Sequence, residues 1–122
     1  MAYDLETWQK EGEVIVKNGR TQQDMPLDYQ LYKDYLDNTE RFNLEARIRG
    51  MKIPQLILAA KDDLVVPINE ARLIKEWNPR SVLLELESGG HTFGARHPSE
   101  SKDLPSDLQR ACDETVSFFS GI

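Results

Sequence analysis

Two short apolar segments, at residues 53–60 and 81–87, constrain the fold of this 122-residue chain more than any other feature. Both have the length of a β-strand, and both are bounded by residues that break regular structure. Between them, apolar residues at helical spacing predict a helix over about 69–77, capped by Asn69 and stopped by Asn78 and Pro79. This order predicts a right-handed crossover and a parallel pair of strands, with helices on both faces of the sheet.

A last helix is predicted near the C-terminus. Residues 106–109, Ser-Asp-Leu-Gln, fit a capping box, and Gly121 closes the helix. Its apolar stripe recurs at steps of three and four residues and comprises Leu104, Leu108, Ala111, Thr115 and Phe119. The single cysteine, Cys112, falls on this stripe. We therefore expect a buried, unreactive thiol that has no partner for an internal disulfide.

The first part of the chain, residues 1–52, is less regular. Residues 12–21 indicate a short hairpin, because Asn18 and Gly19 suit a two-residue type I′ turn. Residues 27–38 show helical spacing after Pro26, whereas residues 39–52 suggest a broken helix or loop. The chain as a whole is predicted to be an α/β protein in which segments 1–52 and 53–122 form one compact domain.

Charge and hydropathy exclude two classes of partner. Lysine and arginine number 15 against 21 aspartates and glutamates, a formal net charge of −6, so we expect neither nucleic acid nor an anionic membrane surface as a partner. The longest aliphatic run, residues 56–60, is far shorter than the roughly 20 residues that cross a bilayer. The first ten residues are polar and acidic, unlike a signal peptide, so we expect a cytoplasmic protein.

Polar residues that can carry chemistry follow each of the two predicted strands. Asp63 lies in the loop at 61–67, and His91 lies in the glycine-rich loop at 88–94. Neighbouring parallel strands are about 4.8 Å apart, so loops that leave the same edge of the sheet can bring these two side chains into contact. The carboxylate would fix the tautomer of the imidazole, which could then take a proton from a nucleophile.

Other readings of these residues stay open. Asp62 could be the acid instead of Asp63, and Asp63 could simply cap the following turn. His97 precedes a proline and is expected on the surface; with His91 it lacks the spacing and partners of a zinc site, so no metal is expected. Trp8 and Trp77 are interpreted as core or interface anchors, and no cofactor is expected.

These motifs, taken together, resemble the carboxyl-terminal half of an α/β-hydrolase, with esterase, dienelactone hydrolase and peptidase-like members nearest. The resemblance covers residues 53–119: an apolar strand, Asp63 four residues before Pro67, a helix, a second strand, Gly-x-His-x-Phe around His91 and a final helix. It implies a partial three-layer sandwich with a small parallel sheet. It also implies that Asp63 and His91 match the acid and the histidine of the catalytic triad.

The chain departs from this family in its nucleophile. The family places a Gly-x-Ser-x-Gly elbow upstream of the acid, but residues 1–80 contain neither serine nor cysteine, and Thr7, Thr21 and Thr39 lack the glycine frame. The His-Gly often found before the acid loop is Ala59-Ala60 here. We therefore expect a truncated α/β-hydrolase-like protein without hydrolase activity alone. The alternatives are half of a serine hydrolase or esterase that another chain completes, and a module that binds a small ligand or peptide.

The missing upstream strands also bear on assembly. Without them, the strand at 56–60 would present an unpaired apolar edge, which invites pairing with another chain. We expect a homo-oligomer, most simply a two-fold dimer through this edge.

Overall fold

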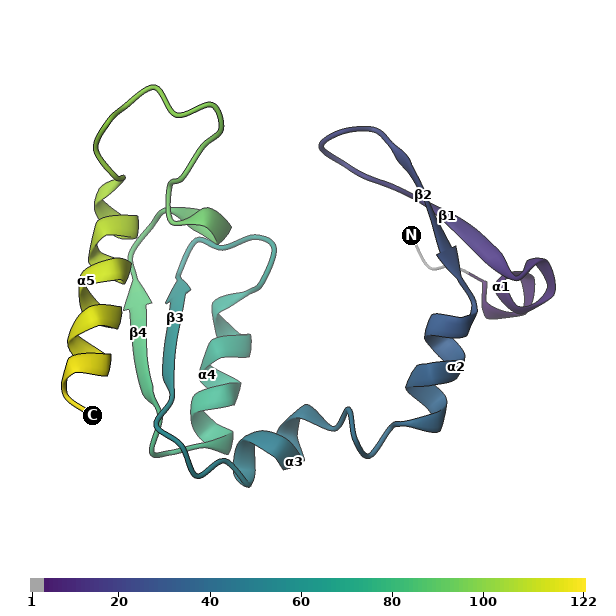
Figure 1. The fold of residues 1–122 in the computed structure, drawn as a ribbon, viewed down its shortest axis with the longest axis horizontal. Coiled ribbons are helices and arrows are strands. Elements are labelled where there is room, and N and C mark those ends of the chain that lie inside the picture. Colours follow the sequence, from purple (N-terminus) through teal and green to yellow (C-terminus); the bar gives the residue numbers. More distant parts are fainter. Residues whose placement is uncertain (1–3) are drawn as a thin grey trace. The chain divides into compact units, whose positions relative to one another are not determined.

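The computed structural model describes residues 4–122 and divides into two compact units, Met1–Asn43 and Leu44–Ile122 (Figure 1). The first unit contains α1 (Leu5–Glu11), β1 (Glu13–Lys17), β2 (Asp24–Asp28) and α2 (Gln30–Asp37). The second contains α3 (Leu44–Arg49), β3 (Leu56–Ala60), α4 (Ile68–Trp77), β4 (Val82–Leu86), the single 3₁₀ turn η1 (Gly90–Thr92) and α5 (Ser106–Ser120). Helices and small sheets thus combine in a mixed α/β protein.

An aromatic cluster organises the first unit. Asp4 caps α1 by accepting from the backbone N–H groups of Glu6 and Thr7. The helix buries Trp8, whose Nε1 donates to the carbonyl of Leu27 at 2.9 Å. The rings of Tyr29 and Tyr32 pack against this indole, with centroids 5.6 and 6.1 Å away. Trp8 is therefore a core anchor of this unit.

The predicted hairpin forms, but its turn is longer than the sequence pattern suggested. The antiparallel strands β1 and β2 are joined by residues 18–23, so the prediction of a two-residue turn at Asn18 and Gly19 was wrong. The Asn18 carboxamide accepts from the N–H groups of Arg20 and Thr21, which folds the chain into a wider loop. Pro26 lies in β2 opposite Ile15, and α2 begins only at Gln30. A proline is tolerated there because both strands of a two-stranded sheet are edges.

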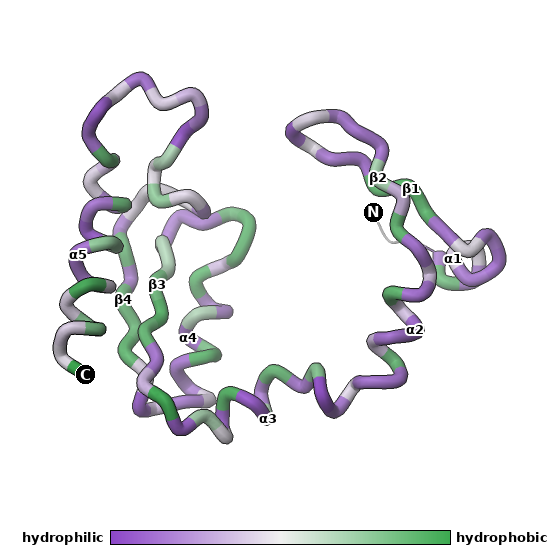
Figure 2. Tube along the Cα trace, in the orientation of Figure 1, coloured by the Kyte–Doolittle hydropathy of each residue, from purple (hydrophilic) through white to green (hydrophobic). Residues whose placement is uncertain are grey.

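The second unit contains the predicted parallel pair. Leu56 lies opposite Val82 and Ala60 opposite Leu86, and α4 provides the crossover. The two strands lie between α4 and α5 (Figure 1), and hydrophobic residues run along β3 (Figure 2). Residues 44–52 belong to this unit, in which α3 packs against α4.

The core of the second unit lies on the α5 side of the sheet. Ala60 and Leu86 are fully buried and pack with Ala111 of α5. The partly buried hydrophobic side chains around them are Leu58, Leu84 and Phe93. The strands and the helix that follows them are thus held together by a small apolar cluster, which sits directly beneath the loops at the carboxyl ends of β3 and β4.

Both predicted N-terminal caps in this unit were wrong, whereas the predicted helix ends at Asn78 and Gly121 are confirmed. The helices α4 and α5 begin at Ile68 and Ser106, immediately after Pro67 and Pro105, and neither N-terminus has a side-chain cap. Each proline holds an extended backbone, with ψ of 142° and 145°, and so sets the helix start. Asn69 lies inside α4, where its carboxamide oxygen accepts from Arg72.

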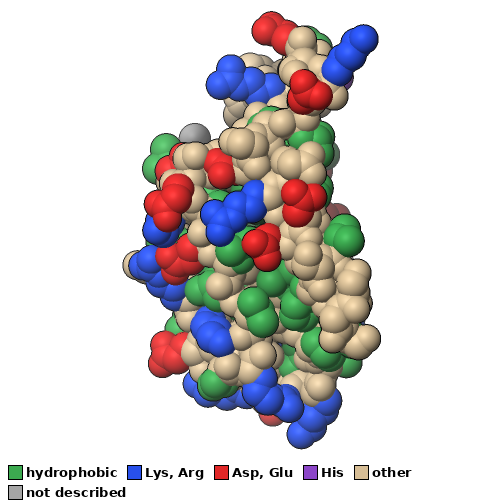
Figure 3. Space-filling view, turned by 90° about the vertical axis from the view of Figure 1, so that its left-hand side faces the viewer, with side chains coloured by type: hydrophobic (Ala, Val, Ile, Leu, Met, Phe, Trp, Pro, Cys, Tyr) green, Lys and Arg blue, Asp and Glu red, His purple; other side chains and the backbone are tan. Residues whose placement is uncertain are grey.

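Cys112 is exposed, which corrects the expectation of a buried thiol. The buried face of α5 is centred on Ala111, and the next residue in a helix is rotated by about 100° from it. Figure 3 shows hydrophobic side chains gathered on the outer face that carries α5, where Val116 and Phe119 are about two-thirds exposed. Among residues 4–122, no helix has the length and apolar character needed to span a membrane.

Candidate active site

The loop after β3 places Asp63 and holds its side chain. One carboxylate oxygen, Oδ1, accepts from the backbone N–H groups of Val65 and Val66 at 2.8 and 2.9 Å. The other oxygen, Oδ2, lies 3.0 Å from Nδ1 of His91. The Asp63 side chain is only 9% exposed. One carboxylate oxygen therefore stabilises the turn that follows Asp63, and the other contacts the imidazole.

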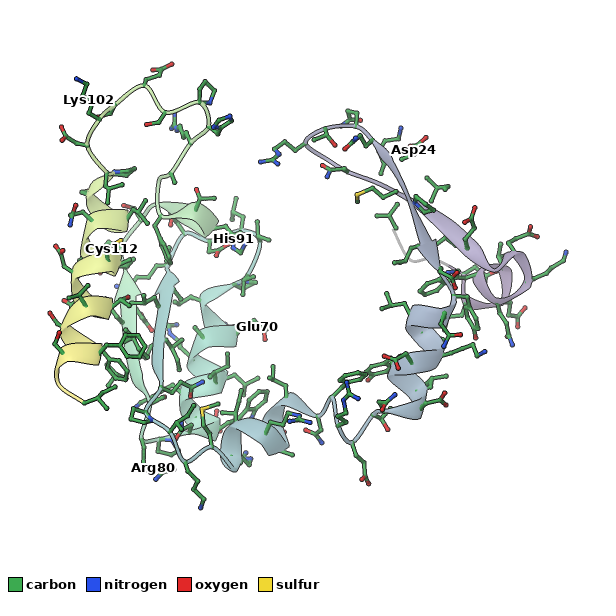
Figure 4. The ribbon with its side chains drawn as sticks, in the orientation of Figure 1. Asp24, Glu70, Arg80, His91, Lys102 and Cys112 are labelled. Atoms are coloured by element: carbon green, nitrogen blue, oxygen red, sulfur yellow. The ribbon has the colours of Figure 1, made fainter. Side chains whose placement is uncertain are left out.

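The loop after β4 turns the chain so that His91 faces this carboxylate. Gly89, Gly90 and Gly94 have φ of 98°, 59° and 84°, values that favour glycine. At Gly89 a Cβ atom would lie 2.8 Å from the carbonyl carbon of Phe93, so no larger residue fits without a shift. His91 then lies in η1, beside the loop that joins β3 to α4 (Figure 4).

The two adjacent aspartates have different partners. Asp63 contacts the imidazole, whereas Oδ1 of Asp62 accepts from the backbone N–H of Gly90 at 2.9 Å. The structure thus brings Asp63, and not Asp62, to His91. The sequence reasoning missed the contact made by Asp62; the signal was the run of two aspartates opposite the Gly-Gly pair that precedes His91.

The electrostatics of the pair favour a charged acid. The N–H of Val66 is the main cause that lowers the pKa of the Asp63 carboxyl; burial opposes this effect, while His91 and the N–H of Val65 lower the pKa further. An ionised carboxylate at Nδ1 places the ring hydrogen on that nitrogen and leaves a lone pair on Nε2. The His91 side chain is 52% exposed, and no group within residues 4–122 hydrogen-bonds to Nε2. This nitrogen can accept a proton from a group that approaches it.

A groove of about 240 Å³ lies beside the pair. Its lining comes from β3, the following loop, α4 and the loop after β4, and comprises Ile57, Leu58, Ala59, Asp63, Val66, Glu70, Ala71, Ile74, His91 and Phe93. Mostly apolar walls with two carboxylates, Asp63 and Glu70, and the His91 imidazole are typical of a small-molecule site, and this groove is smaller than most such sites.

The other candidate residues lie apart from this pair. His97 is an exposed residue of the long loop between η1 and α5, and Trp77 is a half-buried residue of α4. Within residues 4–122, no three histidine, cysteine, aspartate or glutamate side chains are grouped as a metal site requires.

Comparison with known proteins finds similarity over part of the chain. No family model matches it. The relatives carry the name "Putative carbamate hydrolase RutD". The protein from Pseudomonas savastanoi pv. phaseolicola is 32% identical over 59 residues, which is 48% of this chain and 23% of the relative. The protein from Azorhizobium caulinodans is 32% identical over 63 residues (52% and 24%), and that from Agrobacterium fabrum is 35% identical over 57 (47% and 22%).

This chain therefore spans less than a quarter of the length of these relatives. The similarity supports a hydrolase-like character for the matched part.

Proposed function

We propose that this chain supplies the acid and the base of an α/β-hydrolase active site, Asp63 and His91, and that a separate polypeptide segment supplies the nucleophile. The observation that carries the proposal is the 3.0 Å contact between Asp63 Oδ2 and His91 Nδ1. Loops that follow two neighbouring parallel strands make this contact. A carboxylate on Nδ1 and an unengaged Nε2 are what a histidine needs in order to activate a hydroxyl or thiol. The partial similarity to proteins named as carbamate hydrolases supports the same class.

The nucleophile has to come from outside the loops that hold the pair. Residues 1–80 contain neither serine nor cysteine. The hydroxyls nearest to His91 in sequence have other partners: Ser88 donates to Asp107, and Thr92 donates to the carbonyl of Ala95. In this proposal the chain alone lacks the nucleophile, as a truncated hydrolase would, and we expect it to hydrolyse esters no faster than an exposed imidazole does.

The groove favours a hydrolase over a ligand-binding module. Its volume of about 240 Å³ is below the roughly 300–1,000 Å³ of sites that enclose drug-sized ligands. It has the size for a small acyl or carbamoyl group, and both Asp63 and His91 line it. A group bound there would lie against the acid–base pair.

The proposal is tested by supplying the rest of a hydrolase. The relative from Pseudomonas savastanoi, with its matched 59-residue segment deleted, is co-expressed with this chain and assayed with p-nitrophenyl acetate. We expect saturable hydrolysis only when both polypeptides are present. His91→Ala should abolish it, and Asp63→Asn should lower kcat by about 10³–10⁴-fold. His97→Ala removes the chain's other histidine, which lies outside the site, and should leave the rate unchanged.

Three results would contradict the proposal. One is saturable hydrolysis by this chain alone. Another is activity of the mixture that survives His91→Ala. The third is a mixture that co-purifies as a complex and stays inactive.

A further inference from the structure

Three carboxylates hold the loop that presents His91. The hydroxyl of Ser88 donates to Oδ2 of Asp107 in α5 at 2.7 Å, at the start of the loop. The N–H of Gly90 donates to Oδ1 of Asp62 at 2.9 Å, and Nδ1 of His91 lies 3.0 Å from Oδ2 of Asp63. The last two contacts are adjacent along both loops, because Asp62 pairs with Gly90 and Asp63 pairs with His91.

The loop needs such restraints because its backbone is permissive. Gly89 and Gly90 adopt left-handed conformations, and a glycine pair loses more freedom on ordering than any other pair of residues. The N–H of Gly90 lies one residue before His91, so a bond at this position fixes the backbone from which the imidazole projects. The bond to Asp63, by contrast, fixes only the end of the side chain.

We infer that Asp62 is a positioning residue for the acid–base pair, acting on His91 through the backbone of Gly90. It donates nothing to the ring and accepts nothing from it. The two neighbouring aspartates therefore have different roles. Asp63 orients the imidazole, and Asp62 holds the backbone of the loop that carries His91. The catalytic meaning of this role rests on the proposed function, but the positioning itself can be measured in the chain alone.

The tautomer of His91 and the amide of Gly90 provide the readouts. NMR of ring nitrogens reports which nitrogen carries the hydrogen, and His97, which is exposed, is an internal reference in the same spectrum. We expect His91 to be in the Nδ1–H form in the unaltered chain. In Asp62→Ala its signals should move toward those of His97, and the Gly90 amide should exchange about three- to tenfold faster, as the loss of one hydrogen bond allows.

Two further variants separate the hydrogen bond from the charge. Asp62→Asn keeps an oxygen that can accept from Gly90 and should restore the His91 signals and slow amide exchange. Asp103→Ala removes an aspartate from the same unit and should change neither readout. Circular dichroism of each variant checks that it folds, and Asp62→Asn keeps the test decisive should Asp62→Ala fail to fold.

The outcomes separate this inference from the proposed function. His91 signals that stay unchanged in Asp62→Ala, or that move equally in Asp62→Asn, overturn the positioning role even where co-expression gives an active hydrolase. Signals that shift in Asp62→Ala and return in Asp62→Asn support it even where co-expression gives no activity.

Discussion

The core of the second unit makes a prediction with a definite magnitude, for the substitution Leu86→Ala. Leu86 is fully buried and packs with Ala60 and Ala111, so its removal leaves a cavity in the centre of the cluster. Buried leucine-to-alanine changes cost about 2.7–5 kcal/mol. The surrounding Leu58, Leu84 and Phe93 are only partly buried and can move into the space. We therefore expect a loss near the lower end of this range, about 3 kcal/mol.

Urea unfolding with tryptophan fluorescence measures this loss. Trp8 lies in the first unit and Trp77 in the second, so the experiment is done with Trp8→Phe in all variants to report the second unit alone. The matched control is Leu64→Ala, because Leu64 is 96% exposed. We expect this change to cost less than about 0.5 kcal/mol. With a slope of about 1–1.5 kcal/mol per molar urea, Leu86→Ala should lower the midpoint by about 2–3 M.

Equal urea midpoints for Leu86→Ala and Leu64→Ala would contradict this prediction. Such a result would mean that the cluster beneath the loops contributes no more than an exposed side chain does. A large loss for Leu86→Ala also bears on the site, because Phe93 packs on this cluster and lies two residues after His91.

The pKa of the Asp63 carboxyl is lowered, so the stability that this group contributes is present above about pH 4 and is lost as the pH falls through the lowered pKa. In Asp63→Asn the free energy of unfolding should therefore fall less between pH 6 and pH 2 than it does in the unaltered chain. An equal fall in both proteins would contradict this prediction. Gly89→Ala should destabilise the second unit by about 1–3 kcal/mol because of its φ of 98° and the contact with Phe93. Gly19 has open space around it and no positive φ, so Gly19→Ala should leave the free energy of unfolding nearly unchanged. Equal losses of stability in Gly89→Ala and Gly19→Ala would contradict the strained geometry at Gly89. Among residues 4–122, β3 pairs only with β4, so we expect self-association through the other edge of β3. Light scattering at about 10 μM should give twice the 14.0 kDa chain mass, and a monomer would contradict the expectation.

Elements with a strong apolar pattern could be predicted from the sequence. The runs that contain β3 and β4 are short and bounded by breakers, and only parallel pairing suits a helix between them. That pairing places Asp63 and His91 at one edge of the sheet. The contact followed from topology, because carboxyl ends of parallel strands lie together.

Local details that depend on one competing hydrogen bond could not be predicted. A two-residue turn at Asn18 and Gly19 is sterically available, but the Asn18 side chain bonds to the backbone and widens the loop. The two predicted N-caps were wrong for a different reason. Asn69 and Ser106 are good capping residues, but Pro67 and Pro105 occupy the N-cap positions, so Asn69 and Ser106 lie within the first turn of their helices. Whether Cys112 is buried depends on the rotation of α5 about its own axis by the angle of one residue. The apolar pattern alone does not determine this rotation.

The edge of β3 that pairs with no strand within residues 4–122 links the expected dimer to the proposed function. The groove beside His91 is lined in part by Ile57, Leu58 and Ala59 of this strand, so we expect a segment that completes the site to approach along the same edge. By contrast, β4 carries Glu85, which pairs with Arg72, and a charge of this kind suits the outer strand of a sheet. A second copy and a nucleophile-bearing segment would then compete for one edge. Adding the segment should convert the dimer into a one-to-one complex by native mass spectrometry, and a stable two-to-two complex would show that the two partners use different surfaces.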